Sequence, residues 1–317
     1  MGVEYDYSYG VVGDNVTDDT ANLQTAINTA TTNGNILYIT GRSAVSIQTD
    51  GAVLTIPSNA HIKFMLGASL HLNAAGPYSA YGYQMLLLDD VTNCTIDYPQ
   101  LDGAKEMETS APIENNYGIG ISIRGGSGHV INKPVIRDTY GDGIYIAGST
   151  DGSNTPPATI QINQPHVIGA GRNGISVISA NGLLIYEPVL ENTNYSNPMS
   201  GIDFEPNYNT DKLTGIEVIN PRCINCLQGI EFAFENLPGS IAQVVGITIS
   251  GTDQIGSTLS GGTAFAFYNL NKGSYSVSGT ITVNSPRYYH CNDTVYYSSS
   301  WHTGVITVTF NNPTTIA

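Results

Sequence analysis

Two short patterns of apolar and polar residues recur along the chain. The first reads apolar-x-apolar-x-x-Pro-x-apolar, and alternation of this kind is typical of a strand with one buried face. It occurs six times, as CTIDYPQL at 94–101, HVINKPVI at 129–136, IQINQPHV at 160–167, LLIYEPVL at 183–190, IEVINPRC at 216–223 and ITVNSPRY at 281–288. Each copy therefore predicts a short strand near its proline.

The second pattern is Gly-Ile-x-apolar. It reads GISI at 120, GIYI at 143, GISV at 174, GIDF at 201 and GIEF at 229, so the glycines are 23, 31, 27 and 28 residues apart. Each repeat then holds two or three short strands, which can bury an apolar face only by stacking on the next repeat. This predicts an all-β parallel β-helix; the signature of leucine-rich repeats is absent, and the units are short for propeller blades.

Residues 17–32 follow a different period. Leu23, Ala26, Ile27 and Ala30 recur at helical spacing, and Thr17 or Asp18 could cap the N-terminus of a helix. We expect a short amphipathic α-helix that covers the open end of the solenoid, where edge strands would otherwise be exposed. The expected organisation is one domain over 1–317, with an N-terminal cap region at 1–35 and coils at 36–317.

Composition narrows the class of function. The net charge is −15, the pI is about 4.5, and charged residues make up 12% of the chain, against roughly 25% in an average protein. Such a chain is poorly suited to nucleic acid, which needs basic groups along its phosphates. No apolar run is long enough for a transmembrane helix, so we expect no membrane insertion. The N-terminus lacks the basic and apolar regions of a signal peptide.

The four cysteines do not form a disulfide framework in a chain of this length. Cys223 and Cys226 form a C-x-x-C pair, but no second pair accompanies it, so we expect no metal site and no cofactor. Cys94 and Cys223 occupy apolar positions of the first repeat and are predicted to be buried thiols.

The N-terminal segment YGVVGDNVTDDTANLQTAINTATTNGNILYITG resembles the start of the pectate-lyase-like superfamily, in the branch that includes phage tailspike depolymerases. The matching residues are Tyr9, Gly10, Gly13, Asp14, Thr17, Asp18, Asp19, Thr20, Gln24, Ala26 and Ile27. The resemblance covers about 35 residues. It implies a right-handed parallel β-helix, a polysaccharide substrate, a homotrimer, and an extracellular or virion-associated location on a phage tail.

Candidate chemistry lies on the outer face of the second repeat. In Gly-Ile-x-apolar-x the two x positions point outward. Stacking aligns the first of them as Ser122, Tyr145, Ser176, Asp203 and Glu231, and the second as Arg124, Ala147, Ile178, Glu205 and Ala233. Asp203, Glu205 and Glu231 are therefore predicted neighbours, roughly 7 Å apart along a strand and about 4.8 Å apart between coils.

Three carboxylates in one patch repel one another, so at least one should have a raised pKa. An acid that holds a proton beside an ionised base is what glycosidic cleavage requires. The patch offers separations suited both to retaining and to inverting hydrolases, so this choice stays open. A solvated acidic surface without catalytic function is the competing interpretation.

Insertions at 105–116, 149–157 and 188–201 are expected to wall a groove over the patch. We predict that substrate-binding residues are drawn from the loops and strands around it. The candidates are Tyr145, Asp142, Arg172, Ser176, Glu191 and Tyr195. Arg172, like Arg137, could hold a sugar carboxylate or pair with a nearby aspartate.

The expected function is a polysaccharide depolymerase of the tailspike type, a glycoside hydrolase with Asp203, Glu205 and Glu231 as acid and base. A polysaccharide lyase or epimerase acting on a uronate is the first alternative, because GIDFEP partly resembles an epimerase motif at Gly201–Asp203. A glycan-binding protein without catalysis is the second.

Overall fold

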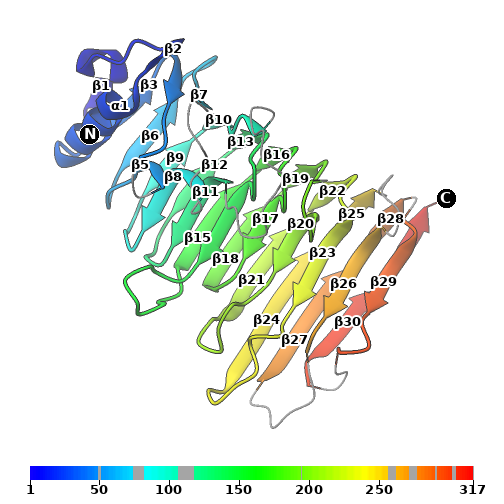
Figure 1. Ribbon diagram of the computed structural model, residues 1–317. Helices are drawn as coiled ribbons and strands as arrows, with labels where there is room; N and C mark the ends of the chain where they lie inside the picture. The colour runs from blue at the N-terminus through cyan, green and yellow to red at the C-terminus, as the bar shows by residue number, and fades with distance from the viewer. Residues whose placement is uncertain are drawn as a thin grey trace.

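The computed structural model describes residues 1–48, 51–73, 82–105, 118–193, 195–255, 262–270, 277–289, 291–301 and 305–316. In these ranges the strands form three parallel sheets, and each sheet runs along the axis of the solenoid (Figure 1). The chain adds one strand to each sheet in turn, so successive coils stack. The predicted all-β parallel solenoid is confirmed, with three strands in a typical coil.

Sheets 1 and 2 have eleven described strands each, and sheet 3 has nine. Sheet 1 consists of β1 (Val3–Tyr5), β3 (Ile36–Ile39), β6 (His61–Phe64), β9 (Thr95–Asp97), β12 (Val130–Asn132), β15 (Ala158–Asn163), β18 (Ala180–Tyr186), β21 (Leu213–Ile219), β24 (Gln243–Ser250), β27 (Val277–Asn284) and β30 (Thr307–Asn311). Sheet 2 consists of β2 (Asp14–Asp18), β4 (Arg42–Val45), β7 (Ser69–Leu72), β10 (Gln100–Asp102), β13 (Val135–Arg137), β16 (His166–Ile168), β19 (Val189–Glu191), β22 (Arg222–Ile224), β25 (Asp253–Ile255), β28 (Arg287–Tyr289) and β31 (Thr314–Ile316). Sheet 3 consists of β5 (Ala52–Thr55), β8 (Tyr83–Asp89), β11 (Gly118–Arg124), β14 (Ile144–Ala147), β17 (Ile175–Val177), β20 (Ser200–Phe204), β23 (Gln228–Ala233), β26 (Thr263–Tyr268) and β29 (Asp293–Tyr297).

The first repeat is the corner between sheets 1 and 2. Its proline lies between two strands, and only two residues separate the strands at these corners. The residue before each proline adopts the left-handed conformation, with φ between 49° and 58° at Tyr98, Lys133, Gln164, Glu187, Asn220 and Ser285. Proline disfavours the right-handed helical region at the preceding residue, and here the left-handed region turns the chain sharply.

The second repeat forms sheet 3. Ile121, Ile144, Ile175, Ile202 and Ile230 are paired in register and fully buried, as predicted. The glycine that precedes each isoleucine stands where sheet 3 packs closely on its surroundings. A Cβ at Gly174 would lie 2.6 Å from the carbonyl oxygen of Gly201 and 3.0 Å from the Leu190 side chain. The repeat therefore requires glycine because there is no room for a side chain.

An aromatic ladder continues the core towards the C-terminus. Phe204 stacks on Phe232, Phe232 on Phe267 and Phe267 on Tyr297, with ring centroids 5.2, 4.7 and 4.7 Å apart. Offset stacking at these distances is favourable beyond the area it buries. The inward face of β20 and β23 is thus rigidly packed directly behind the outward residues of the same strands.

The predicted helix is α1 (Thr20–Thr32), which lies at the N-terminal end of the stack beside the 3₁₀ helix η1 (Asp6–Tyr9) (Figure 1). Its residues Leu23, Ala26, Ile27 and Ala30 are buried in the main core, as the spacing predicted. The expected start was wrong, because Thr17 and Asp18 belong to β2, which pairs with β4. Asp18 nevertheless accepts a hydrogen bond from the Thr20 N–H.

Strands of sheets 1 and 2 thus begin within 1–35, ahead of the boundary expected from the sequence. Within the described ranges, no helix combines the length and the apolar character needed to cross a bilayer.

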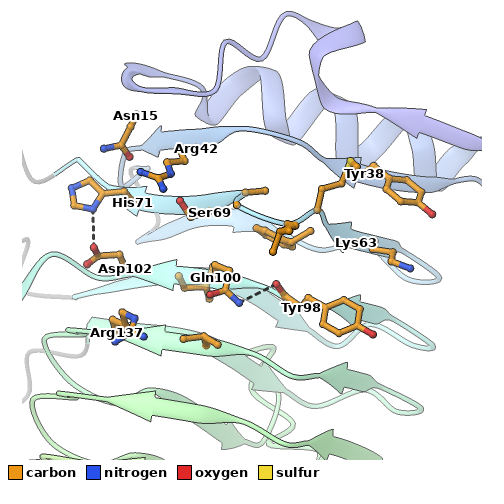
Figure 2. Close-up of a pocket in the computed structure, with 17 residues that line it drawn as sticks. Asn15, Tyr38, Arg42, Lys63, Ser69, His71, Tyr98, Gln100, Asp102 and Arg137 are labelled. Carbon is orange, nitrogen blue, oxygen red and sulfur yellow. Dashed lines mark hydrogen bonds and ion pairs between the residues drawn. The ribbon is translucent and has the colours of Figure 1, made fainter.

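The corner between β6 and β7, like that between β1 and β2, is longer than the two-residue corners. It uses four residues, 65–68, and Leu66 is fully exposed. A surface cavity of about 780 Å³ lies at this corner, between the outer faces of sheets 1 and 2 (Figure 2).

We predict that Ile175→Ala destabilises the fold by about 2–5 kcal/mol, the range for a fully buried large-to-small change. Urea unfolding gives the free energy directly. The matched control is Gln161→Ala on the exposed face of β15, which should cost less than about 0.5 kcal/mol. Equal effects of the two substitutions would contradict the inward placement of Ile175.

Candidate active site

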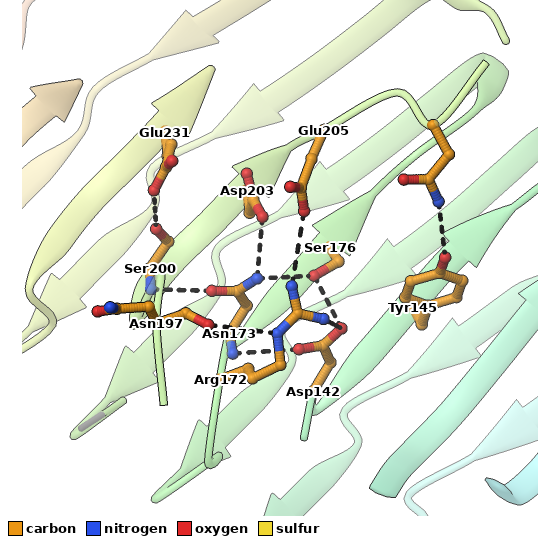
Figure 3. Close-up of polar contacts among 11 residues, drawn as sticks. Asp142, Tyr145, Arg172, Asn173, Ser176, Asn197, Ser200, Asp203, Glu205 and Glu231 are labelled. Atoms are coloured by element: carbon orange, nitrogen blue, oxygen red, sulfur yellow. Dashed lines mark hydrogen bonds and ion pairs between the residues drawn. The ribbon is translucent and has the colours of Figure 1, made fainter. Parts of the chain in front are cut away.

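The outward positions of sheet 3 align as the repeat predicted. Ser122 pairs with Tyr145, Tyr145 with Ser176, Ser176 with Asp203, and Asp203 with Glu231. Glu205 follows Asp203 by two residues and extends from the end of the same strand (Figure 3). The three predicted carboxylates therefore lie together on the outer face of sheet 3.

These residues face away from the core but are not solvated. Asp203 is completely buried, Glu231 is 7% exposed, and Asp142 and Ser176 are buried beside them. Glu205 reaches the surface, with 37% of its side chain exposed. The competing interpretation of a solvated acidic surface does not fit this burial.

Asn173 is the centre of a hydrogen-bond network that joins three coils. Its Nδ2 donates to Asp203 Oδ2 and to Ser176 Oγ, both at 3.0 Å, and its Oδ1 accepts from the Ser200 N–H at 2.9 Å. Ser176 Oγ donates onward to Asp142 Oδ2 at 3.0 Å, and the Asn173 N–H donates to Asp142 Oδ1 at 3.2 Å. The network fixes Asp142 and Asp203 on either side of one amide (Figure 3).

Arg172 bridges two carboxylates from neighbouring coils. Its guanidinium nitrogens lie 3.6 Å from Asp142 Oδ2 and 3.6 Å from Glu205 Oε2. Its Nε donates to the Asn197 carbonyl at 3.5 Å, and the N–H of Ser196 donates to the carbonyl of Gly171 at 2.7 Å. The insertion after β19 is thereby held against the site, as its length suggested. The insertion at 105–116 lies outside the described residues from 106 onward.

The cluster contains more carboxylates than one arginine can neutralise. Burial raises the pKa of Asp142, and Arg172 partly opposes this shift. Burial also raises the pKa of Asp203 well above its ordinary value, and the charges of Glu231 and Glu205 raise it further. Asp203 Oδ1 is buried without a hydrogen-bond partner, so a proton on this carboxyl is favoured. Asp203 is therefore the group in the cluster that stays protonated.

Glu205 and Glu231 differ in their surroundings. Burial raises the pKa of Glu205, while the charge of Arg172 opposes the shift. Burial raises the pKa of Glu231 to about 7, although Ser200 Oγ donates to its Oε2 at 2.8 Å and opposes the shift. Glu231 therefore exchanges its proton near neutral pH, which is the property of an efficient acid or base.

The other predicted substrate-binding residues lie in different surroundings. Tyr145 is 7% exposed, its hydroxyl accepts from Asn207 Nδ2 at 3.4 Å, and the Arg124 guanidinium lies 4.9 Å from its ring centre. Tyr145 borders a cavity of about 610 Å³ between residues 148–154 of the second insertion and residues 207–210. Burial leaves little of its ring free for stacking on a sugar.

Tyr195 is 40% exposed and packs edge-on against Tyr140 in the loop beside Arg172, so it remains a candidate sugar platform. Glu191 does not join the cluster. It lies on sheet 2 and pairs with His166 Nε2 at 2.8 Å.

Two contributors were not expected from the sequence. Asn207 holds the Tyr145 hydroxyl, and Tyr268 lies near Glu231, where burial and the Glu231 charge raise the pKa of Tyr268 to about 12. Extending the second outward ladder past Ala233 would have located Tyr268, but its strand lacks the Gly-Ile signature. Within the described ranges, no three His, Cys, Asp or Glu side chains are placed to hold a metal ion.

No protein family in the comparison matches this chain. Among curated proteins, the uncharacterized protein YclG of Bacillus subtilis (strain 168) is 28% identical in an alignment of 217 positions that covers 62% of this chain and 37% of that protein. The chain thus matches little more than a third of the length of this relative.

Solved structures show the same fold. A 1,3-α-1,4-β-D-galactose-4-sulfate-3,6-anhydro-D-galactose-2-sulfate 4 galactohydrolase superposes with a TM-score of 0.68 at 13% identity, over 100% of this chain and 88% of that one. Gene product 12 of bacteriophage phi29 gives 0.62 at 16% identity over 98% and 50%. The A-module of the mannuronan C-5 epimerase AlgE4 of Azotobacter vinelandii gives 0.58 at 13% identity over 98% and 95%. These neighbours share the parallel β-helix fold of this chain.

We predict that Glu231 makes the fold less stable as pH rises. Its pKa is raised in the folded state, so the folded chain keeps a proton that the unfolded chain has lost between about pH 4.5 and about pH 7. Unfolding free energy should fall across this window. Glu231→Gln should flatten the decline and be more stable than the wild type at about pH 8.

Urea unfolding at several pH values measures this effect. Glu217→Gln is the matched control, because Glu217 is exposed on β21 and its removal should leave the pH dependence unchanged. Parallel curves for Glu231→Gln and the wild type would contradict the prediction.

Proposed function

We propose that this protein is a glycoside hydrolase that cleaves a surface or capsular polysaccharide. The observation that supports it best is the buried cluster of Asp142, Asp203, Glu205 and Glu231 around Arg172. It combines carboxyls whose pKa values burial raises with a carboxylate that lies beside Arg172. Hydrolysis of a glycosidic bond requires one protonated and one ionised carboxyl. The galactohydrolase neighbour shares the fold of this chain, and its name describes an enzyme that acts on a glycan.

Glu205 is the proposed base. It is the most exposed member of the cluster, and Arg172 stabilises its ionised form. In this role it takes a proton from water, and the hydroxide equivalent attacks the anomeric carbon. Asp203 stands two residues before it on β20, and burial and its acidic neighbours favour the protonated form of Asp203.

Glu231 is the proposed acid, because its pKa of about 7 keeps a proton available near neutral pH. It gives this proton to the departing glycosidic oxygen. Glu231 lies one strand across and two residues along from Glu205, a diagonal of roughly 8 Å between backbone positions.

A lyase or epimerase acting on a uronate is the second candidate. Arg172 favours it, since its guanidinium is partly exposed beside the carboxylates and could neutralise a sugar carboxylate. The AlgE4 neighbour is an epimerase with this fold. A protein that binds a glycan without cleaving it is the third candidate.

We predict that Glu205→Gln and Asp203→Asn each lower turnover by about 10²–10⁴-fold, because the base and its protonated partner are lost. The amides keep the shape of the buried side chains, so folding and glycan binding should persist. The measurement is the release of new reducing ends from purified surface polysaccharides, with Glu217→Gln as the silent control.

The products separate the candidates. New reducing ends without ultraviolet-absorbing unsaturated ends support hydrolysis, and nuclear magnetic resonance of the first product shows whether the anomer is inverted. Unsaturated ends indicate a lyase, and binding without product indicates the third candidate. Full activity of both variants on a cleaved substrate would place the catalytic groups elsewhere.

We also propose that the protein acts as a homotrimer outside the cell or on a virion. The support is the sequence resemblance to tailspike proteins and the fold shared with gene product 12 of phage phi29. Light scattering at micromolar concentration should give three times the chain mass of 33.7 kDa. A monomer mass would contradict the proposal for this chain.

A further inference from the structure

A second feature of the surface has no role in the proposed reaction. The cavity of about 780 Å³ is lined by residues of β2, β3, β4, β6, β7, β10 and β13 and by the corners next to them. All of these belong to sheets 1 and 2, whereas the carboxylate cluster lies on sheet 3. The long corner at 65–68 forms part of the cavity wall, where a two-residue corner would be shorter.

Basic residues concentrate at this cavity in an otherwise acidic chain. Of the eleven lysines and arginines, Arg42, Lys63 and Arg137 line it, and Figure 2 shows them around its rim. Asp102 is the one carboxylate among its lining residues, and it is paired with His71 at 3.2 Å. The lining therefore carries a net positive charge within a chain of −15, so the charge is complementary to an anion.

Tyrosine rings alternate with lysines along the same edge. Lys63 Nζ lies 5.8 Å from the centre of the Tyr38 ring and 5.9 Å from that of Tyr98. Lys133 Nζ lies 6.0 Å from the centre of the Tyr98 ring. The series is therefore Tyr38, Lys63, Tyr98 and Lys133. Tyr98 is 44% exposed. Exposed tyrosines offer an apolar face together with a polar hydroxyl, which matches the mixed surface of a sugar ring.

The groups are spread along the axis of the β-helix. Arg42 on β4 and Arg137 on β13 are three strand spacings apart, or roughly 14 Å. The series from Tyr38 to Lys133 covers the same number of coils on sheet 1. One small anion cannot reach both arginines, whereas a polymer with charges at intervals can lie along both edges.

We propose that this cavity is a second, non-catalytic binding site for an anionic polysaccharide that carries carboxylate or sulfate groups. Arg42, Lys63 and Arg137 contact the charges, and Tyr38 and Tyr98 contact the sugar rings. The site keeps a polymer on the molecule independently of the sheet 3 cluster.

Single-stranded nucleic acid also combines cationic and aromatic contacts. The composition favours the glycan, because nucleic-acid-binding domains are basic as a whole, whereas this chain has a pI of about 4.5.

The test is affinity electrophoresis through gels that contain polygalacturonate, dextran sulfate or neutral dextran. It uses the Asp203→Asn protein, so that no substrate is consumed and the result does not depend on the proposed reaction. We expect retardation by polygalacturonate or dextran sulfate and none by neutral dextran. Because the protein is acidic, retention by a polyanion requires a local site.

The double variant R42A/R137A should bind roughly three- to thirtyfold more weakly, as the loss of two exposed charge contacts implies. Tyr98→Ala should bind roughly two- to tenfold more weakly. The control R222A/R287A removes the same charge from exposed positions farther along sheet 2 and should bind as the parent does. Thermal unfolding of each variant verifies the fold.

Four results would overturn the proposal. The first is no retardation by either polyanion, and the second is an equal loss of affinity in the R222A/R287A control. The third is unchanged affinity in Tyr98→Ala. The fourth is binding of an oligodeoxythymidine that is as tight as binding of polygalacturonate. The third reduces the cavity to a simple cation cluster, and the fourth identifies it as a nucleic-acid site.

Discussion

Each coil lies about 4.8 Å from the next and is hydrogen-bonded to it residue by residue, and the other features of this molecule depend on that stacking. Inside, it places isoleucine on isoleucine at Ile144, Ile175 and Ile202, where burial stabilises the fold. Outside, the same register determines which residues become neighbours. A polar residue at one outward position must lie beside whatever the next coil places there.

That constraint explains why the site needs its amide and its arginine. Asp203 and Glu231 lie one strand spacing apart, and both are buried. Two buried negative charges at that distance would be strongly unfavourable. Asn173 satisfies one oxygen of Asp203, Ser200 satisfies one of Glu231, and Arg172 neutralises Glu205 from the neighbouring turn. The remaining imbalance is relieved by keeping protons, which is the same property that would make the cluster an acid and a base.

The sequence predicted what the repeat controls. The five stacked isoleucines and the ladder from Ser122 to Glu231 follow from position in Gly-Ile-x-apolar alone, since register is fixed wherever one face is buried. The start of α1 was misplaced, because pairing of β2 with β4 is a contact between distant residues that no local capping signal reports. Glu191 was grouped with the site because sequence distance from Ser200 does not reveal the turn from sheet 2 to sheet 3. Burial of Asp203 was also not predictable, as it depends on how the loops fold back over the strand.

The corners decide where such a site can form. Between sheets 1 and 2 the left-handed residue and the proline leave room for only two residues at most coils, so that edge cannot carry insertions. Several connections on both sides of sheet 3 are longer, with ten residues between β14 and β15 on the side of sheet 1 and six between β13 and β14 on the side of sheet 2. Loops can therefore rise on either side of sheet 3 and exclude water from its outer face, which strengthens every charge interaction there. Two corners between sheets 1 and 2 are longer in the described residues, 6–13 between β1 and β2 and 65–68 between β6 and β7. The second coincides with the basic cavity, so longer connections accompany both surfaces to which we assign binding.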